Sequence, residues 1–155
     1  MAQEQIVRSL YEAINSHNSQ KFVSMFTDDG VFTDKSSGRT YRGKEELRGM
    51  MATWLRAFPD VKINVSNIIG SGDLYCVEFS IIGSHMGPLG EGEEEIPASN
   101  NKINVPSCDV VHMKKEKIHS INCYLAANVM MEQIGAMPSH RMAQRAADES
   151  RQSLM

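Results

Sequence analysis

The chain has 155 residues, of which 41% are hydrophobic and 23% charged, a balance that predicts one soluble globular domain with a real core. A net charge of only −3 gives no broad positive field, so we expect neither nucleic acid nor a membrane surface as a partner. The one basic cluster, Met113–Lys117, fits a solvated turn between strands.

Cysteine usage and the N-terminus favour a cytoplasmic protein. Cys76, Cys108 and Cys123 cannot all pair with one another, and each falls inside a predicted strand, so free reduced thiols are expected. The sequence has neither the pattern of a signal peptide nor an apolar run long enough to span a bilayer.

Helical periodicity marks the first part of the chain. Apolar residues recur at helical spacing in 4–17, 19–26 and 44–58, and Pro59 ends the third helix. A short strand, 30–34, is predicted between the second and third helices, followed by a turn at 35–43.

Alternating apolar residues then predict a run of strands. They cover 61–69, 74–85, 102–113 and 117–125, and we expect them to pair as an antiparallel meander. The last strand runs into a short helix that ends near Gly135. Helices gathered on one face of an antiparallel sheet make an α+β domain, expected over residues 1–137, with a polar tail at 138–155 that forms a weak helix or a mobile end.

Asp109 is the main candidate for acid–base chemistry. It falls in phase with Ile103, Val105 and Val111 on the apolar face of its strand. Desolvation there should raise its pKa, which suits a general acid or base. The alternative is a structural aspartate that accepts hydrogen bonds, and the sequence leaves both open.

Other polar residues are candidates for the same pocket. His85, in phase with the apolar face of its strand, could hold a neighbouring carboxylate, although a lone histidine there is more often structural. Asn122 and Tyr124 share a face of the last strand and could stabilise an enolate, or simply satisfy each other.

Aromatic residues are the expected apolar wall. Trp54 and Phe58 lie on the inward stripe of their helix, and Phe79 lies on the apolar face of its strand. Residues of this kind usually belong to the hydrophobic core, and only less often form the wall of a ligand pocket. The remaining histidines lack metal-type spacing, so no metal site is expected, and no nucleotide-binding or serine-hydrolase motif occurs.

Several stretches, in order, resemble the SnoaL-like polyketide cyclase family of the nuclear transport factor 2-like superfamily. They are FTDDGVFTD (26–34), YRGKEELR (41–48), AFPDVKINV (57–65), GSHMGPL (83–89), IPASNNK (96–102) and a closing Y…MMEQIG. The resemblance implies a cone-shaped α+β fold, in which helices pack on a curved sheet around an apolar pocket. It also implies dimers or higher oligomers formed through the sheet, and a homodimer is expected. It also implies aldol-type ring closure without metal or cofactor, in which an acidic residue removes a proton next to a ketone.

The chain departs from the family pattern at one informative place. The family commonly has an aspartate seven residues before the glutamine of its closing motif, and here that position is Ala126. A methyl group cannot accept a proton, so either Asp109, with His85 as its partner, supplies the proton transfer, or the family's chemistry is lost.

Three functions follow from these residues. The first is a cofactor-independent cyclase or isomerase-type enzyme that acts on a small apolar carbonyl compound. In this enzyme Asp109 is the acid or base, His85 orients it, and Asn122 and Tyr124 meet the oxyanion. The second is a module that binds an apolar ligand without catalysis, and the third is a protein-interaction domain that uses the outer sheet face.

Overall fold

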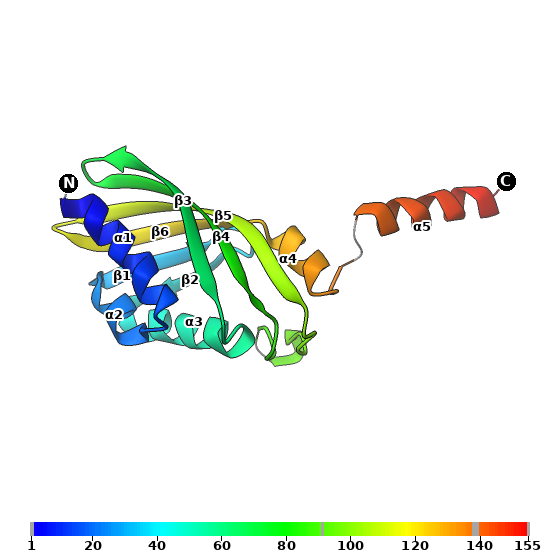
Figure 1. The fold of residues 1–155 in the computed structure, drawn as a ribbon, viewed down its shortest axis with the longest axis horizontal. Coiled ribbons are helices and arrows are strands. Elements are labelled where there is room, and N and C mark those ends of the chain that lie inside the picture. The colour runs from blue at the N-terminus through cyan, green and yellow to red at the C-terminus, as the bar shows by residue number, and fades with distance from the viewer. Residues whose placement is uncertain (1, 91, 138–139, 155) are drawn as a thin grey trace.

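The computed structural model describes residues 2–90, 92–137 and 140–154, which form five α-helices, one short 3₁₀ helix and six strands (Figure 1). The α-helices are α1 (Ala2–Asn15), α2 (Ser19–Ser24), α3 (Gly43–Ala57), α4 (Ala127–Gln133) and α5 (His140–Ser153). The strands are β1 (Phe26–Asp34), β2 (Arg39–Arg42), β3 (Lys62–Ser71), β4 (Leu74–Ser84), β5 (Lys102–Lys114) and β6 (Lys117–Leu125).

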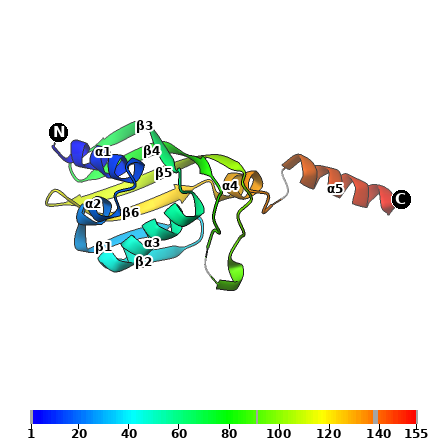
Figure 2. The same ribbon diagram turned by 60° about the horizontal axis from the view of Figure 1, so that its bottom comes forward.

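The α+β prediction is confirmed, with helices packed on one face of a curved, open sheet (Figures 1 and 2). The sheet order is β2-β1-β6-β5-β4-β3. The predicted antiparallel meander of the four later strands is confirmed. The sheet as a whole is mixed rather than antiparallel, because β1 runs parallel to β6. The other correction is β2, which pairs antiparallel with β1 inside the stretch predicted to be only a turn.

The N-terminal helices form where the apolar spacing predicts them. In α1 the residues Val7, Leu10 and Tyr11 are all buried, so the stripe faces the sheet. The side chain of Asn18 caps α2 by accepting a hydrogen bond from the backbone N–H of Lys21 at 3.0 Å, as an N-cap residue should.

Alternation along the central strands separates an inner from an outer sheet face. On β4, Val77, Phe79 and Ile81 are buried, and on β5, Val105 and Val111 are buried. The strand partners of these residues point to the same side, since side chains alternate along a strand and align across a ladder. The inner face therefore carries the core, and the helices cover it.

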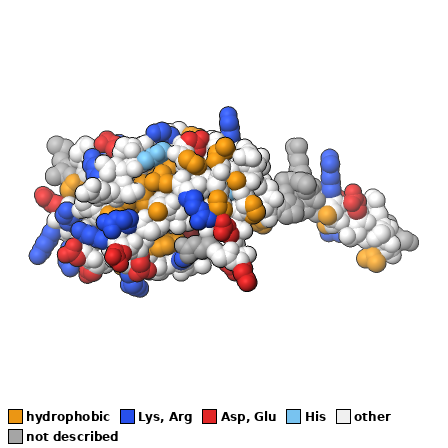
Figure 3. Space-filling view, turned by 90° about the horizontal axis from the view of Figure 1, so that it is seen from below, with side chains coloured by type: hydrophobic (Ala, Val, Ile, Leu, Met, Phe, Trp, Pro, Cys, Tyr) orange, Lys and Arg blue, Asp and Glu red, His pale blue; other side chains and the backbone are white. Residues whose placement is uncertain are grey.

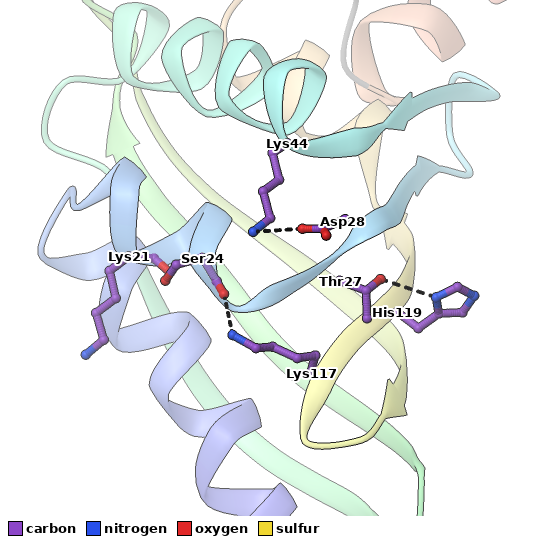
Figure 4. A network of polar contacts seen from close by, with 7 residues as sticks. All are labelled: Lys21, Ser24, Thr27, Asp28, Lys44, Lys117 and His119. Carbon is purple, nitrogen blue, oxygen red and sulfur yellow. Dashed lines mark hydrogen bonds and ion pairs between the residues drawn. The ribbon is translucent and has the colours of Figure 1, made fainter.

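Polar contacts join the start of β1 to its neighbours (Figure 4). The Lys117 ammonium donates to the backbone carbonyl of Ser24 at 2.9 Å, which links the first residue of β6 to the last residue of α2. Lys44 of α3 pairs with Asp28 of β1 at 3.3 Å, but the Asp28 side chain is fully exposed, so this ion pair contributes little stability.

Helix α5 projects away from the sheet in both ribbon views (Figures 1 and 2). Its described side chains, 144–153, are all exposed. Within the described ranges, no helix combines the length and the apolar character needed to cross a membrane.

Candidate functional site

A cavity opens between the helices and the inner sheet face. Its volume is about 100 Å³. Six aromatic side chains contribute to a wall that is otherwise mostly aliphatic: Tyr11, Phe22, Phe32, Tyr41, Trp54 and Phe79. On the helix side of the molecule, hydrophobic side chains reach the surface in the middle of a face rimmed by charged groups (Figure 3).

Two carboxylates line this otherwise apolar cavity, Asp34 and Asp109. They lie in one row across the sheet, because Asp34 of β1 is the register partner of Cys123 of β6, which in turn pairs with Asp109 of β5. Neighbouring strands are about 4.8 Å apart, so the backbones of the two aspartates are separated by about 10 Å. The Cys123 thiol lies between them and also lines the cavity.

Asp109 has one short hydrogen bond, from Tyr11, and the Cys123 thiol lies close to the same carboxyl group. It is only 4% exposed, and the Tyr11 hydroxyl donates to its Oδ2 at 2.8 Å. Oδ1 has no hydrogen-bond partner among the described residues. A buried, unpaired carboxylate oxygen in a cavity is able to exchange a proton with a bound molecule.

Burial raises the pKa of Asp109 to about 6, while the Tyr11 hydroxyl and the Cys123 thiol favour the charged form and limit that rise. Burial, and next the charge of Asp109, raise the pKa of Tyr11 well above its usual value. Tyr11 therefore stays protonated and acts as a donor. The predicted desolvated aspartate is present, with a partner that the sequence analysis did not assign.

Asp34 lies at the end of β1, where the chain turns toward β2. Its Oδ1 accepts hydrogen bonds from the backbone N–H of Ser36 at 2.9 Å and from the Ser36 hydroxyl at 2.6 Å. Its Oδ2 accepts from the Ser37 hydroxyl at 3.0 Å. These donors fix the carboxylate at the cavity wall. Arg39 is the register partner of Asp34 on β2, and its guanidinium lies 5.3 Å from the ring centre of Tyr41.

His85 is not the partner of Asp109, so that prediction is corrected. Asp109 pairs with Val77, and His85 lies eight residues further on, or about 26 Å along an extended chain. Nδ1 of His85 contacts the Ser99 hydroxyl at 2.9 Å and accepts from the Ser99 N–H at 3.2 Å. The neutral ring thus carries its proton on Nε2, an atom without a partner in the described structure. His85 therefore has a structural role, because these contacts with Ser99 hold together the two ends of the loop that follows β4.

Asn122 and Tyr124 do not face the cavity, so the expectation that they meet an oxyanion there is also wrong. Asn122 pairs with Val110 and Tyr124 with Cys108, on the outer sheet face, and Tyr124 is 52% exposed. The cause is a register shift near the start of β6, where His112 pairs with Ser120 but Met113 pairs with Ile118. This bulge reverses the phase that the sequence pattern extrapolates from Ile118.

The three aromatic residues expected at the cavity wall lie in two different places. Trp54 and Phe79 line the cavity. Phe58 is not among its lining residues, because its ring is fully buried between Trp54, at a centroid distance of 5.5 Å, and His85, at 5.4 Å. Phe58 belongs to the core.

Ala126 occupies the N-cap position of α4 without a side-chain cap. It packs against the core beside Leu125, which does line the cavity, but it is not itself a lining residue. Gln133, later in the same motif, fastens α4 to β5 because its amide pairs with both the N–H and the carbonyl of Asn104. The closing motif therefore retains its structural glutamine, whereas its usual carboxylate position is a methyl group.

Sequence reasoning missed Tyr11, Asp34 and Cys123 as site residues. Tyr11 lies on the inward stripe predicted for its helix, and a hydroxyl on such a stripe is the available signal. Asp34 and Cys123 meet only through the parallel pairing of β1 with β6, which joins segments distant in sequence. No group of three or more His, Cys, Asp or Glu side chains within the described ranges is arranged to hold a metal ion.

A family model for SnoaL-like polyketide cyclase matches residues 4–134. The chain belongs to the SnoaL-like polyketide cyclase family. The matched region runs from the first turn of α1 to the residue after α4, so it includes Tyr11, Asp34 and Asp109. A search of curated proteins gave no match.

Solved structures share the fold at low sequence identity. A protein from Jannaschia sp. CCS1 assigned as a SnoaL-like polyketide cyclase superposes with a TM-score of 0.78 and 18% identity, covering 88% of this chain and 94% of its own. A Catenulispora acidiphila protein with a ketosteroid isomerase-like fold, solved with trimethylamine, has a TM-score of 0.71 and 22% identity, and the match covers 84% of this chain and 92% of that protein. IdmH from Streptomyces antibioticus, assigned as a polyketide cyclase, has a TM-score of 0.71 and 20% identity, and the match covers 86% of this chain and 98% of IdmH.

Proposed function

We propose that this family member is a cofactor-independent enzyme that moves a proton at the carbon next to the carbonyl of a small apolar compound, as in aldol cyclisation or isomerisation. The observation that carries the proposal is the free Oδ1 of Asp109 inside an apolar cavity. The family membership supports the same class of chemistry.

Asp109 changes its charge at a pH of about 6. With a pKa of about 6, it is largely neutral below that pH and can donate from Oδ1 to a carbonyl oxygen. Above that pH it is largely charged and no longer donates. Tyr11 keeps Oδ2 occupied, so it is the positioning residue that takes the role first expected of His85.

Asp34 supplies a second carboxylate in the same row, about 10 Å away by backbone. Enolisation needs a base at carbon and a donor at oxygen, and two carboxylates in different surroundings can divide these tasks. We assign the two roles as follows: neutral Asp109 donates a hydrogen bond to the substrate's carbonyl oxygen, and the Asp34 carboxylate removes the proton from the neighbouring carbon.

The test is deuterium incorporation at the carbon next to the carbonyl, followed by NMR in D₂O with cyclohexanone and acetophenone. The wild-type protein should accelerate the exchange, and Asp109→Asn should reduce the rate by about 10²- to 10⁴-fold, the usual effect of losing a positioned acid–base group. Asp28→Asn, which changes a fully exposed carboxylate, is the matched control and should leave the rate unchanged. Exchange that persists at the wild-type rate in Asp109→Asn would exclude Asp109 from the reaction.

A second candidate function is binding of a small alkylammonium ion without catalysis. Aromatic faces attract such cations, and the six aromatic side chains of the cavity accompany two carboxylates. No Lys, Arg or His occurs among the assigned lining residues of the described chain. The Catenulispora acidiphila relative was solved with an amine, which supports the same ligand class.

Choline and its neutral isostere 3,3-dimethylbutanol separate shape from charge. An ammonium site predicts that choline quenches or shifts Trp54 fluorescence at a concentration several-fold lower than the isostere does, with the difference growing as the pH rises through about 6. Equal affinity for both compounds would refute this candidate. It would leave the proton-transfer proposal intact, because that proposal is judged by exchange at carbon.

A further inference from the structure

Two thiols meet on the outer face of the sheet, away from the cavity. The Sγ atoms of Cys76 on β4 and Cys108 on β5 are 3.2 Å apart. Both residues are half-buried and both are free thiols. Their contact is a thiol–thiol hydrogen bond in which either sulfur can donate.

The strand register explains why these two side chains meet. Val77 pairs directly with Asp109, and Cys76 and Cys108 each precede one member of that pair. In an antiparallel ladder this makes the two cysteines diagonal neighbours on the opposite face from Val77 and Asp109. The thiol pair thus lies on the outer face of the sheet, next to the position where Asp109 points into the cavity from the inner face.

Cys123 is excluded from this pair by the same alternation. It is buried on the inner face, where its sulfur lies 3.6 Å from the Ser107 hydroxyl. A sheet therefore separates Cys123 from the other two thiols. The chain holds one close pair and one isolated thiol, a natural internal comparison.

We propose that Cys76 and Cys108 form a redox-active dithiol that hydrogen peroxide converts to an intrachain disulfide between β4 and β5. A disulfide has an S–S length of about 2.05 Å, so the two sulfurs must approach by about 1 Å, a movement within reach of side-chain rotation and a small strand shift. Two half-buried thiols remain within reach of a molecule as small as peroxide.

The reaction proceeds in two balanced steps. The thiolate of the first cysteine attacks one peroxide oxygen and the O–O bond breaks, giving a sulfenic acid and, after proton uptake, one water. The second thiol then attacks the sulfenic sulfur, the S–O bond breaks, and the displaced hydroxide takes the thiol proton to form a second water. Two thiols lose two electrons in total, and peroxide gains them.

The two thiols share one hydrogen bond at the sheet surface. Burial, followed by the hydrogen bond with Cys76, raises the pKa of Cys108 to about 12. Because either sulfur of this hydrogen bond can be the donor, either thiol can make the first attack, and the other then resolves the sulfenic acid. The resulting bond would fasten the two strands at the register of Asp109.

To test the proposal, the full chain is treated with hydrogen peroxide, the remaining thiols are alkylated, and the protein is digested with trypsin and analysed by mass spectrometry. The three cysteines fall in separate tryptic peptides, 63–102, 103–114 and 118–141. The expected product is peptide 63–102 linked by a disulfide to peptide 103–114. Reduction should separate the two peptides again. Peptide 118–141 should be recovered unlinked, with its cysteine alkylated. Cys76→Ser and Cys108→Ser should each abolish the link, and Cys123→Ser, the matched control, should keep it.

Mixing isotopically light and heavy chains before oxidation distinguishes a bond within one chain from a bond between two. The proposal predicts linked peptides of a single isotope. Light–heavy linked peptides, links that involve 118–141, or oxidation of Cys76 to sulfinic and sulfonic acid without any link would each overturn it.

Discussion

Replacing Asp109 with asparagine should remove a pH-dependent cost to folding. The pKa of Asp109 is 3.8 in its ordinary state and about 6 in the folded protein. A folded pKa above the unfolded one means that ionisation opposes folding. This cost is absent below about 3.8, grows through the interval, and is complete above about 6.

The size of the effect follows from the two values. Each tenfold change in proton affinity corresponds to about 1.4 kcal/mol, so the interval from 3.8 to about 6 costs about 3 kcal/mol at pH 8. The asparagine side chain of the variant does not titrate. The free energy of unfolding of Asp109→Asn, minus that of the wild type, should therefore rise by about 3 kcal/mol between about pH 3.5 and pH 8.

Urea unfolding followed by the fluorescence of Trp54, the single tryptophan and a cavity-lining residue, measures both free energies at each pH. Subtracting the two curves cancels every other titrating group common to both proteins. A difference that stays constant across this pH range would show that Asp109 is not desolvated, and the reasoning would fail.

Three further outcomes test separate parts of the structure. Tyr11→Phe removes the donor that lowers the pKa of Asp109, so the carboxyl signal should titrate at a higher pH by NMR, and an unchanged midpoint would contradict the hydrogen bond. Ala126→Asp adds an N-cap to α4 and should stabilise the protein by about 1 kcal/mol, seen as a Tm higher by about 2–4 °C, whereas Ala126→Leu should give no such gain. Burial lowers the pKa of His85 below 6.5, so its ring should titrate below that pH and the amide signal of Ser99 should move with it; independent behaviour of the two signals would refute the contact.

The sequence predicts the elements well because local periodicity decides them. The stripe Val7, Leu10 and Tyr11 specifies α1, and alternation in 102–113 specifies β5 with Asp109 on the inner face. Both patterns involve residues a few positions apart. A prediction of this kind needs no knowledge of where the rest of the chain lies.

The site itself depends on contacts that local patterns do not contain. Asp34 joins Asp109 only because β1 runs parallel to β6, and Tyr11 reaches Asp109 across 98 residues of sequence. The bulge near Ser120 reverses the phase of β6, which moves Asn122 to the outer face. Register and long-range pairing, rather than residue type, decide which polar groups meet.

The most direct test of the central claim is the pKa of Asp109 itself, measured by carboxyl-carbon NMR titration and assigned with Asp109→Asn. A midpoint near 6 is predicted, because the carboxyl is buried in an apolar cavity with one oxygen unpaired. A midpoint at or below 3.8 would contradict the account, since it would describe a well-solvated or fully hydrogen-bonded aspartate that has no reason to exchange protons with a ligand.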